Sequence, residues 1–169
     1  MNPKDSDKNI VIYTDGSCYP NPDGEGGWAF YYKYRGTEVT KFGYASGVTN
    51  NHMELTAIYF ALLFVPTVSE NRTPLVIVTD SSYCKNALTK WWEGWASNGW
   101  RNSTGRSVSS KSLIKAMILR LREHELHRKV TFLKVKGHSG VPENEHVDQQ
   151  ASIARKDRAT NWTTTNKKA

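Results

Sequence analysis

The run Leu75–Thr79 constrains the fold more than any other feature of this sequence. All five of its residues are apolar or β-branched. A strand with one wet face alternates apolar and polar residues, whereas an unbroken apolar run is typical of a strand that is buried on both faces. Such strands are central and parallel, so the sequence predicts a sheet of the α/β class.

Strand and helix patterns along the rest of the chain fit such a sheet. Strands are predicted over 10–14, 28–34, 39–44, 75–79 and 130–135. Helices are predicted over 52–65, 82–98 in two segments, 111–127 and 142–156. Residues 21–27 are expected to form a loop, and residues 99–110, here called the protruding loop, an exposed excursion. The expected fold is α/β, a mixed five-stranded sheet with three antiparallel strands plus two parallel strands, flanked by helices.

The length of 169 residues suits one compact domain, expected over 10–156 between a flexible N-terminus, 1–9, and a flexible tail, 157–169. No apolar run approaches the ~18 residues of a membrane span. The polar start lacks the apolar core of a secretory signal. Cys18 and Cys84 are far apart and have no metal-type spacing. We therefore expect a cytoplasmic monomer with reduced thiols and no membrane partner.

The formal charge of +7 is unevenly distributed. Residues 101–136 carry ten basic and two acidic side chains, a local net of +8, whereas the remainder holds 13 basic and 14 acidic residues. A concentrated basic stretch usually binds a polyanion, most often nucleic acid and less often an anionic membrane. A solvated helix face would give the same composition, so charge alone leaves these interpretations open.

Four carboxylates lie at the ends of predicted elements, where open α/β sheets place their chemistry. Asp15 and Asp80 each close a strand, Glu54 falls in the first turn of a helix, and Asp148 falls in the last helix. Each has an ordinary alternative. Asp15 could be a turn residue, Asp80 a helix N-cap and Glu54 part of a capping box, while Asp148 could face water. Magnesium prefers oxygen ligands, so a cluster of these acids would suit it better than zinc.

The motifs around these acids resemble those of the ribonuclease H type 1 family. They occur in family order over roughly residues 9–156, as TDGSC at 14–18, TNNHMEL at 49–55, TDS at 79–81, KGHSG at 136–140 and PENE at 142–145. The resemblance implies a ribonuclease H-like fold. It also implies an endonuclease that hydrolyses the RNA strand of RNA–DNA hybrids and leaves 5′-phosphate and 3′-hydroxyl ends.

The same resemblance implies two Mg²⁺ ions per site, with Mn²⁺ as a possible substitute. Their implied ligands are Asp15, Glu54, Asp80 and Asp148, with Asp15 expected to bridge the ions. His138, in a loop flanked by glycines, is implied to transfer a proton or to assist product release. The alternative for a lone histidine there is an ordinary surface residue.

The resemblance further implies a set of hybrid-binding residues: Ser17, Cys18, Asn21, Thr49, Asn50, Asn51 and Trp91. Side-chain amides of the Asn pair could read the 2′-hydroxyl that distinguishes RNA from DNA, or could instead cap the helix. Trp91 is one of four Trp residues within positions 91–100. Most of these are expected to pack in the core.

The basic stretch resembles the basic protrusion of bacterial members, with two departures. Residues 96–98 are Ala-Ser-Asn, where those relatives carry consecutive basic residues, and Ser110 stands where the family often has an Asn in a phosphate pocket. We therefore expect a weaker, more salt-sensitive grip. Its main contributors are expected to be Arg101, Arg106, Lys111 and Lys115.

Two other functions remain open at this point. A junction resolvase or integrase-like nuclease shares clustered carboxylates, but not the contexts of Asn50, Asn51 and His138; cutting of duplex DNA at a rate comparable to hybrid would favour it. A non-catalytic nucleic-acid-binding module is disfavoured because all four acids are present. Undiminished hybrid binding without magnesium-dependent cleavage would favour that module.

Overall fold

Five strands form one mixed sheet in the order β3-β2-β1-β4-β5. The protein is represented by a computed structural model that describes residues 8–67 and 72–161. The strands are β1 (Ile10–Tyr19), β2 (Gly24–Tyr34), β3 (Thr37–Val48), β4 (Leu75–Thr79) and β5 (Val130–Lys134). The first three are antiparallel, whereas β4 runs parallel to both β1 and β5. The predicted fold class is confirmed.

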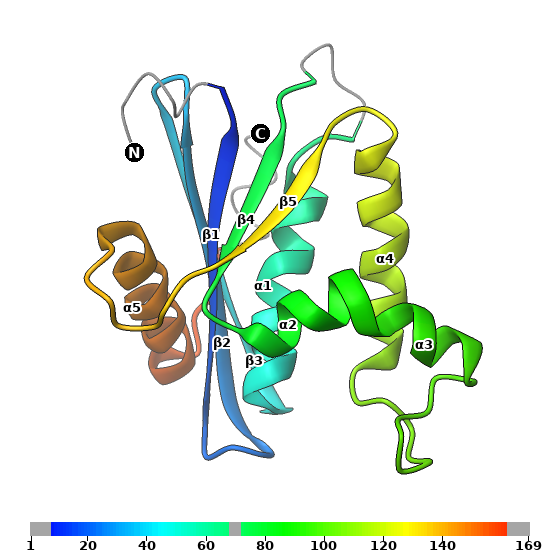
Figure 1. Cartoon of the computed structure of the whole chain (residues 1–169). Coiled ribbons are helices and arrows are strands. Elements are labelled where there is room, and N and C mark those ends of the chain that lie inside the picture. The colour runs from blue at the N-terminus through cyan, green and yellow to red at the C-terminus, as the bar shows by residue number, and fades with distance from the viewer. Residues whose placement is uncertain (1–7, 68–71, 162–169) are drawn as a thin grey trace.

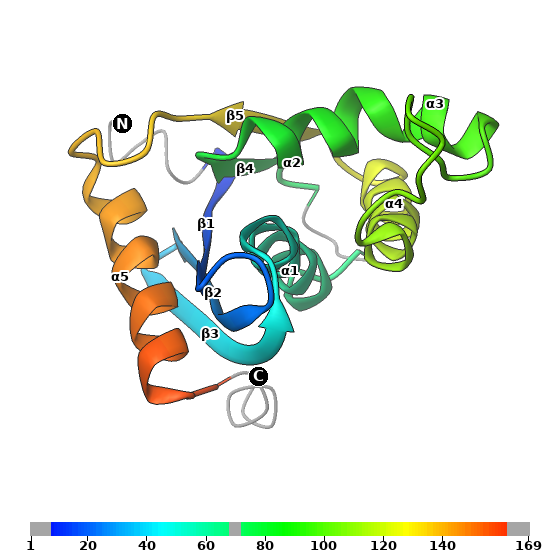
Figure 2. The same ribbon diagram turned by 90° about the horizontal axis from the view of Figure 1, so that it is seen from below.

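Helices cover both faces of this sheet. They are α1 (Asn50–Phe64), α2 (Ser82–Asn86), η1 (Ala87–Trp91), α3 (Trp92–Ser97), α4 (Lys111–Glu125) and α5 (Pro142–Asp157). Figures 1 and 2 show α5 on one side of the sheet and α1 with α4 on the other. The main core fills the α1 side, with Ile12, Phe30, Leu55 and Ile77 fully buried. Among the described residues, no helix is long and apolar enough to cross a membrane.

The apolar run that predicted a central strand is β4, which has a parallel partner on each side. Leu75 and Ile77 are completely buried, and Val78 is nearly so. Because β4 is short, its last pair with β1 is Tyr13↔Val78. From Asp15 to Tyr19, β1 is paired with β2 alone, which leaves one edge of β1 open beside the end of β4.

Two predictions about the start of the sheet are wrong. β1 does not end at Asp15 but continues to Tyr19, and β2 begins at Gly24, inside the predicted loop 21–27. The glycines there serve close packing. A Cβ on Gly27 would lie 2.0 Å from the carbonyl oxygen of Ala151 in α5, so only glycine lets this helix approach the strand.

Two further predictions are refined. The helical residues 82–97 form three consecutive segments, with η1 a π-helical stretch between α2 and α3. The tail is ordered to Asn161, whose Oδ1 accepts from the Phe42 backbone N–H (2.6 Å) and whose Nδ2 donates to the Thr40 carbonyl (3.1 Å). The tail that was predicted from 157 thus makes defined contacts as far as Asn161. Residues 1–7 and 162–169 lie outside the described residues.

Candidate active site

Three carboxylates from three different elements meet at the open edge of β1. Asp15 lies on β1, Asp80 directly follows β4, and Glu54 comes from α1. Each offers an oxygen atom, and these three atoms lie within 4.8 Å of one another. The structure thus brings together three of the four acids that the sequence singles out.

Gly16 allows α1 to lie directly against β1. A Cβ on Gly16 would be 2.4 Å from the backbone nitrogen of Glu54 and 2.5 Å from the carbonyl carbon of Met53, far inside van der Waals contact. The Gly16 backbone N–H also donates to Oδ1 of Asp15 (2.9 Å). Gly16 therefore determines how closely the carboxylates of Asp15 and Glu54 approach.

Other residues take the capping roles that the sequence left open for the acids. Oγ1 of Thr49 accepts from the backbone at the start of α1 (3.1 Å), and Oγ of Ser81 does the same for α2 (3.1 Å). Because α1 begins at Asn50, Glu54 lies beyond the first turn in which it was predicted. The capping alternatives for Asp80, Glu54 and the Asn pair are therefore wrong.

Burial and mutual repulsion disfavour the ionised forms of these acids. Asp15 is 3% exposed and Glu54 5%. Burial, followed by the charge of Asp80, raises the pKa of Asp15 to about 8. Burial, followed by Asp15, raises the pKa of Glu54 well above its usual range. For Asp80 the pKa is raised by burial and then by Asp148. A cation between these groups would relieve the repulsion.

The donor set fits a hard divalent cation. Oε2 of Glu54 is buried and has no hydrogen-bond partner among the described residues. A buried carboxylate oxygen without a partner is costly unless a cation or donor meets it. The three clustered donors are all carboxylates. Oxygen donors of this kind suit Mg²⁺ or Mn²⁺ rather than zinc. Asp15, Glu54 and Asp80 could together hold such an ion.

Asp148 and His138 lie at the rim of this cluster. Asp148 is on α5 with a side chain 41% exposed, and its Oδ2 is 3.9 Å from Nδ1 of His138, whose side chain is 85% exposed. The charge of Asp148 contributes to the raised pKa of both Asp15 and Asp80. It is not among the three acids whose oxygens lie within 4.8 Å, so Asp148 borders the cluster.

A groove at the N-terminus of α1 gathers four of the predicted hybrid-binding residues. Its lining consists of Asn21, Pro22, Thr49, Asn50, Asn51, Tyr83, Ser109 and Ser110, around a volume of about 330 Å³. Oδ1 of Asn21 accepts from the Asn50 backbone N–H (3.1 Å), and Oγ of Ser110 is hydrogen-bonded to Nδ1 of His52 (2.7 Å). Tyr83 and Ser109 were missed because no local motif marks them.

Ser17 and Cys18 lie on the open part of β1, and both have protein partners. Nε of Arg155 donates to Oγ of Ser17 (2.9 Å), while the Cys18 thiol donates to the Val48 carbonyl (3.2 Å). Arg155 was also missed, because it is one basic residue in a helix of mixed charge. Only the fold brings it to β1.

The basic stretch 101–136 includes two parts with different roles. The first part is exposed and comprises Arg101, Arg106, Lys111 and Lys115. The second part bonds carbonyl groups at the end of α1: Arg120 and His124 donate to Leu62 (2.9 and 2.8 Å), and Arg128 donates to Pro66 (3.2 Å). Arg120 and Arg128 are thus engaged within the fold, whereas Arg122, Lys129, Lys134 and Lys136 are exposed. That the exposed residues attract a polyanion stays a prediction.

The RNase H family model matches residues 7–156. The chain belongs to this family. A ribonuclease H of Granulibacter bethesdensis is 40% identical over 156 residues, which are 92% of this chain and 98% of the relative. A ribonuclease H of Thermus thermophilus is also 40% identical, over 89% of this chain and 86% of the relative. The resemblance drawn from the motifs is confirmed.

Two solved structures share the fold of this chain. LC9-RNase H1, a type 1 RNase H with the type 2 active-site motif, superposes with a TM-score of 0.75 at 23% identity, over 90% of this chain and 74% of that chain. The foamy viral protease-reverse transcriptase in complex with an RNA/DNA hybrid gives 0.69 at 20% identity, over 92% of this chain and 21% of that chain. These likenesses support the sheet order and the helix placement.

The Trp cluster of this RNase H chain lies at the border of the core. Trp92, Trp95 and Trp100 are partly buried against it. Trp91 is exposed and makes an edge contact with the Tyr83 ring, 5.8 Å between centroids. Nζ of Lys115 lies 5.2 Å from the centroid of Trp100. The rings thus support the base of the protruding loop, and none is fully buried as core residues would be.

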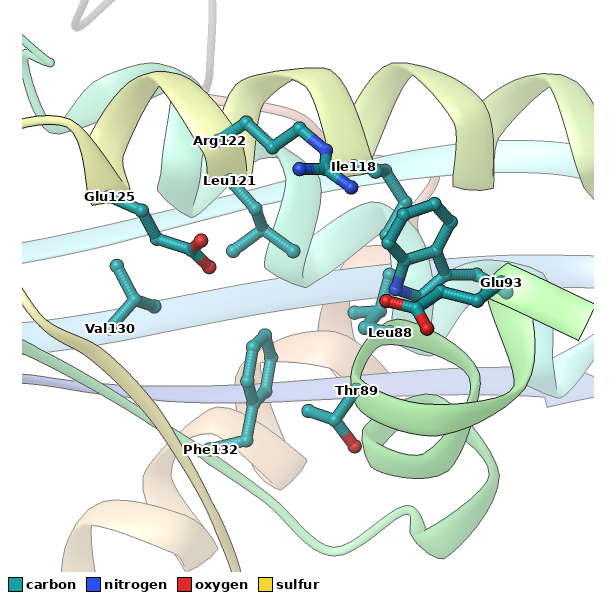
Figure 3. Close-up of a pocket in the computed structure, with 10 residues that line it drawn as sticks. Leu88, Thr89, Glu93, Ile118, Leu121, Arg122, Glu125, Val130 and Phe132 are labelled. Atoms are coloured by element: carbon teal, nitrogen blue, oxygen red, sulfur yellow. The ribbon is translucent and has the colours of Figure 1, made fainter. Parts of the chain in front are cut away.

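A second hollow lies between η1, α4 and β5, apart from the predicted site residues. Figure 3 shows its apolar lining of Leu121, Val130 and Phe132, with Arg122 and Glu125 among the charged residues around it. Its volume is about 290 Å³. The guanidinium of Arg122 lies over Trp92, 4.9 Å from the ring centroid. None of the predicted catalytic or hybrid-binding residues lines it.

Proposed function

We propose that this chain is an endonuclease that hydrolyses the RNA strand of RNA–DNA hybrids with two divalent ions. The ions are Mg²⁺, with Mn²⁺ as a substitute, and the products carry 5′-phosphate and 3′-hydroxyl ends. The observation that carries this proposal is the cluster of two buried acids, Asp15 and Glu54, with the half-buried Asp80, in a chain of the RNase H family. We also propose that the enzyme acts as a monomer in the cytoplasm.

The four acids would hold the ions and keep them at one end of β1. Asp15 would hold the ions together with the other three acids, because Glu54, Asp80 and Asp148 all affect its pKa. When bound, the ions activate a water molecule and stabilise the leaving 3′ oxygen. Without cations, the negative centre repels a phosphate. The acids thus make cleavage depend on metal.

We assign to His138 the movement of a proton at the rim of the site. Its Nδ1 faces Asp148 at 3.9 Å, and its ring is open to solvent. The flanking loop includes Gly137, where a Cβ would lie 3.1 Å from Oδ2 of Asp80. This close packing keeps the His138 loop beside the acids. Its proposed role is proton transfer or assistance to product release, so His138→Ala is expected to slow turnover without abolishing it.

The groove at α1 and the first part of the basic stretch would hold the duplex. Asn50 and Asn51 offer amides for 2′-hydroxyls and base edges in a minor groove. Thr49 is proposed to lie near a DNA-strand phosphate, and Trp91 to pack against DNA sugars. Ser17, Cys18 and Asn21 complete the hybrid contacts. The cationic grip comes from Arg101, Arg106, Lys111 and Lys115.

A strand-labelled hybrid incubated with and without Mg²⁺ tests this function, with Asp15→Asn as the inactive control. The RNA strand is expected to be cut only by the parent and only with metal. Survival of the RNA, or a variant as active as the parent, would contradict the proposal. Equal cutting of duplex DNA would favour a resolvase-like nuclease, and tight binding without cleavage would favour a non-catalytic module.

A further inference from the structure

Arg155 presents a cation beside the carboxylate cluster, on the side away from the protruding loop. Figures 1 and 2 show α5 and the protruding loop at opposite ends of the molecule. Nε of Arg155 donates to Oγ of Ser17 (2.9 Å), and the guanidinium carbon lies 5.9 Å from the ring centroid of Tyr19. Within residues 8–67 and 72–161, no acceptor binds its two Nη groups. These groups are free to bind a ligand.

β1 and α5 place the guanidinium of Arg155 on the same surface as the carboxylates, farther along β1. Side chains alternate along β1, and Gly16 faces α1, so Asp15, Ser17 and Tyr19 share the face toward α5. On α5, Asp148 and Arg155 are seven residues apart, about two turns and roughly 10 Å along the axis. Asp148 therefore belongs to the acidic end of this surface, and Arg155 lies farther along the open edge of β1.

The neighbouring Arg158 shows what a structural arginine looks like here. Its Nε lies 3.9 Å from Oε2 of Glu25, and its guanidinium lies 5.9 Å from the ring centroid of Tyr44. Arg155 has no such carboxylate among the described residues. Its ring neighbour Tyr19 is 72% exposed, so the guanidinium rests on an open surface. A positive group held in place without a counter-charge is suited to an anionic ligand.

We propose that Arg155 binds a backbone phosphate of the RNA strand, a few nucleotides from the bond that is cut. The inference rests on the proposed function and extends it to a residue outside the family motifs. A strand whose scissile phosphate lies at the carboxylates and which follows the open edge of β1 passes Ser17 and Tyr19. Phosphates recur about every 3.4 Å along the axis of one strand, so roughly 10 Å corresponds to about three nucleotides.

Ser17 and Tyr19 prepare the guanidinium for this contact. Ser17 fixes Nε, which leaves the fork of Nη groups to bind two phosphate oxygens. The Tyr19 ring limits the motion of the side chain, so less conformational entropy is lost on binding. Ser17 would thus act on the hybrid partly through Arg155.

The test compares Arg155→Gln with Lys156→Gln, which removes the same charge from the next residue of α5. Lys156 is exposed and lies about 100° around the helix from Arg155. Affinity for a fluorescent hybrid is measured in EDTA at several salt concentrations. Because one phosphate contact adds about 0.9 to the slope of log affinity against log salt, Arg155→Gln is expected to flatten the slope by about 1 and to weaken binding about fivefold to tenfold near 0.1 M salt. Lys156→Gln is expected to leave both unchanged.

A purely structural role for Arg155 gives a different result. If Arg155→Gln lowers Tm but keeps the parent's salt slope, or if both variants behave alike, the proposal is wrong. Arg155→Lys keeps the charge, so its salt slope is expected to lie close to that of the parent. Its affinity is expected to stay below that of the parent. In Mg²⁺, KM is expected to rise for Arg155→Gln while kcat at saturating hybrid stays close to that of the parent.

A second measurement identifies the strand. Hybrids carrying one uncharged methylphosphonate near the cut are bound by parent and Arg155→Gln. At one position of the RNA strand, the methylphosphonate is expected to lower the affinity of the parent but not to lower that of the variant further. If such coupling is found only at positions of the DNA strand, the proposal is wrong. A parent that shows this coupling but never cleaves would contradict only the proposed function, and cleavage with no coupling would contradict only the role of Arg155.

Discussion

The acidic centre and the protruding loop carry opposite charges in opposite structural settings. Asp15 and Glu54 are buried on regular elements, where their separation depends on the packing of α1 against β1. Asn102 in the protruding loop makes local bonds: its Oδ1 accepts from the backbone N–H groups of Thr104 and Arg106. Buried charges interact strongly, so their function depends on precise positions. Exposed charges are screened by salt, so small shifts in their positions matter less. Similar substitutions should therefore have unequal effects in the two regions.

The largest difference is expected between Gly16→Ala and Gly105→Ala. At Gly16 the new Cβ meets the backbone of α1 at 2.4 Å, so the variant is expected to lose about 3 kcal/mol of unfolding free energy and most of its activity. At Gly105 the space is open and only φ = +80° opposes alanine, which costs about 1 kcal/mol. Urea unfolding and hybrid cleavage measure both variants. Equal losses would show that the acidic centre is no more demanding than the loop.

Asp15→Asn should separate stability from activity. The pKa of Asp15 is raised to about 8 in the folded protein, above the value of about 3.9 in the unfolded chain. Because the unfolded chain loses this proton more readily, the free energy of unfolding falls as pH rises from about 4 to about 8. Without metal, the variant is expected to be about 1–3 kcal/mol more stable than the parent at pH 7. Activity and Mg²⁺-dependent stabilisation are expected to be lost.

Thermal unfolding with and without Mg²⁺ over this pH range checks this prediction. The matched control is Asp148→Asn, which removes a half-exposed carboxylate at the rim of the same cluster and should stabilise the metal-free protein less. A metal-free Asp15→Asn that unfolds below the parent's temperature would show that the acids do not repel one another in the fold.

The two regions also differ in how far the sequence reveals them. The acids could be identified because each lies in a short motif, and the apolar run of β4 indicates the sheet edge that they share. The open edge of β1 could not be predicted from the sequence. The glycines within 24–27 indicate a loop, and only the close packing of Ala151 against Gly27 explains why they lie in a strand. Arg155 and Tyr83 reach the site through contacts between distant segments. Local patterns hold no signal for such contacts.

The basic stretch illustrates the same limit from another direction. Charge counting treats Arg106 and Arg128 alike, although one is exposed and the other bonds the carbonyl of Pro66. The carbonyl groups at the end of α1 need donors, and a helix C-terminus favours cations. That need becomes visible only when α4 is placed beside α1. Composition therefore overestimated the surface available to a polyanion.

His124 tests the buried part of this stretch through pH. Its Nε2 donates to Leu62, and burial, with smaller effects of Arg120 and Arg128, lowers its pKa. The unfolded histidine takes up a proton near pH 6.5, so protons favour the unfolded chain and stability is lost as pH falls below about 6.5. Between pH 7.5 and 5.5 this loss is expected to be about 1 kcal/mol.

The contribution of His124 is obtained by difference, because His52 also has a lowered pKa. The difference in unfolding free energy between pH 7.5 and 5.5 is expected to shrink in His124→Gln and to persist in His127→Gln, which changes a half-buried histidine two residues beyond α4. An unchanged pH dependence in His124→Gln would show that this histidine is not held neutral by burial.

The smallest effect is expected for Arg106→Gln in the protruding loop. Its side chain is exposed and its local turn is held by the backbone N–H, so stability should change by less than about 0.5 kcal/mol. Binding of hybrid should weaken only severalfold, with a salt slope flatter by about 1 and an unchanged kcat. Anisotropy titrations at several salt concentrations measure the slope. A loss of kcat would mean that the loop influences the geometry of the acids, and the contrast between the two regions would then fail.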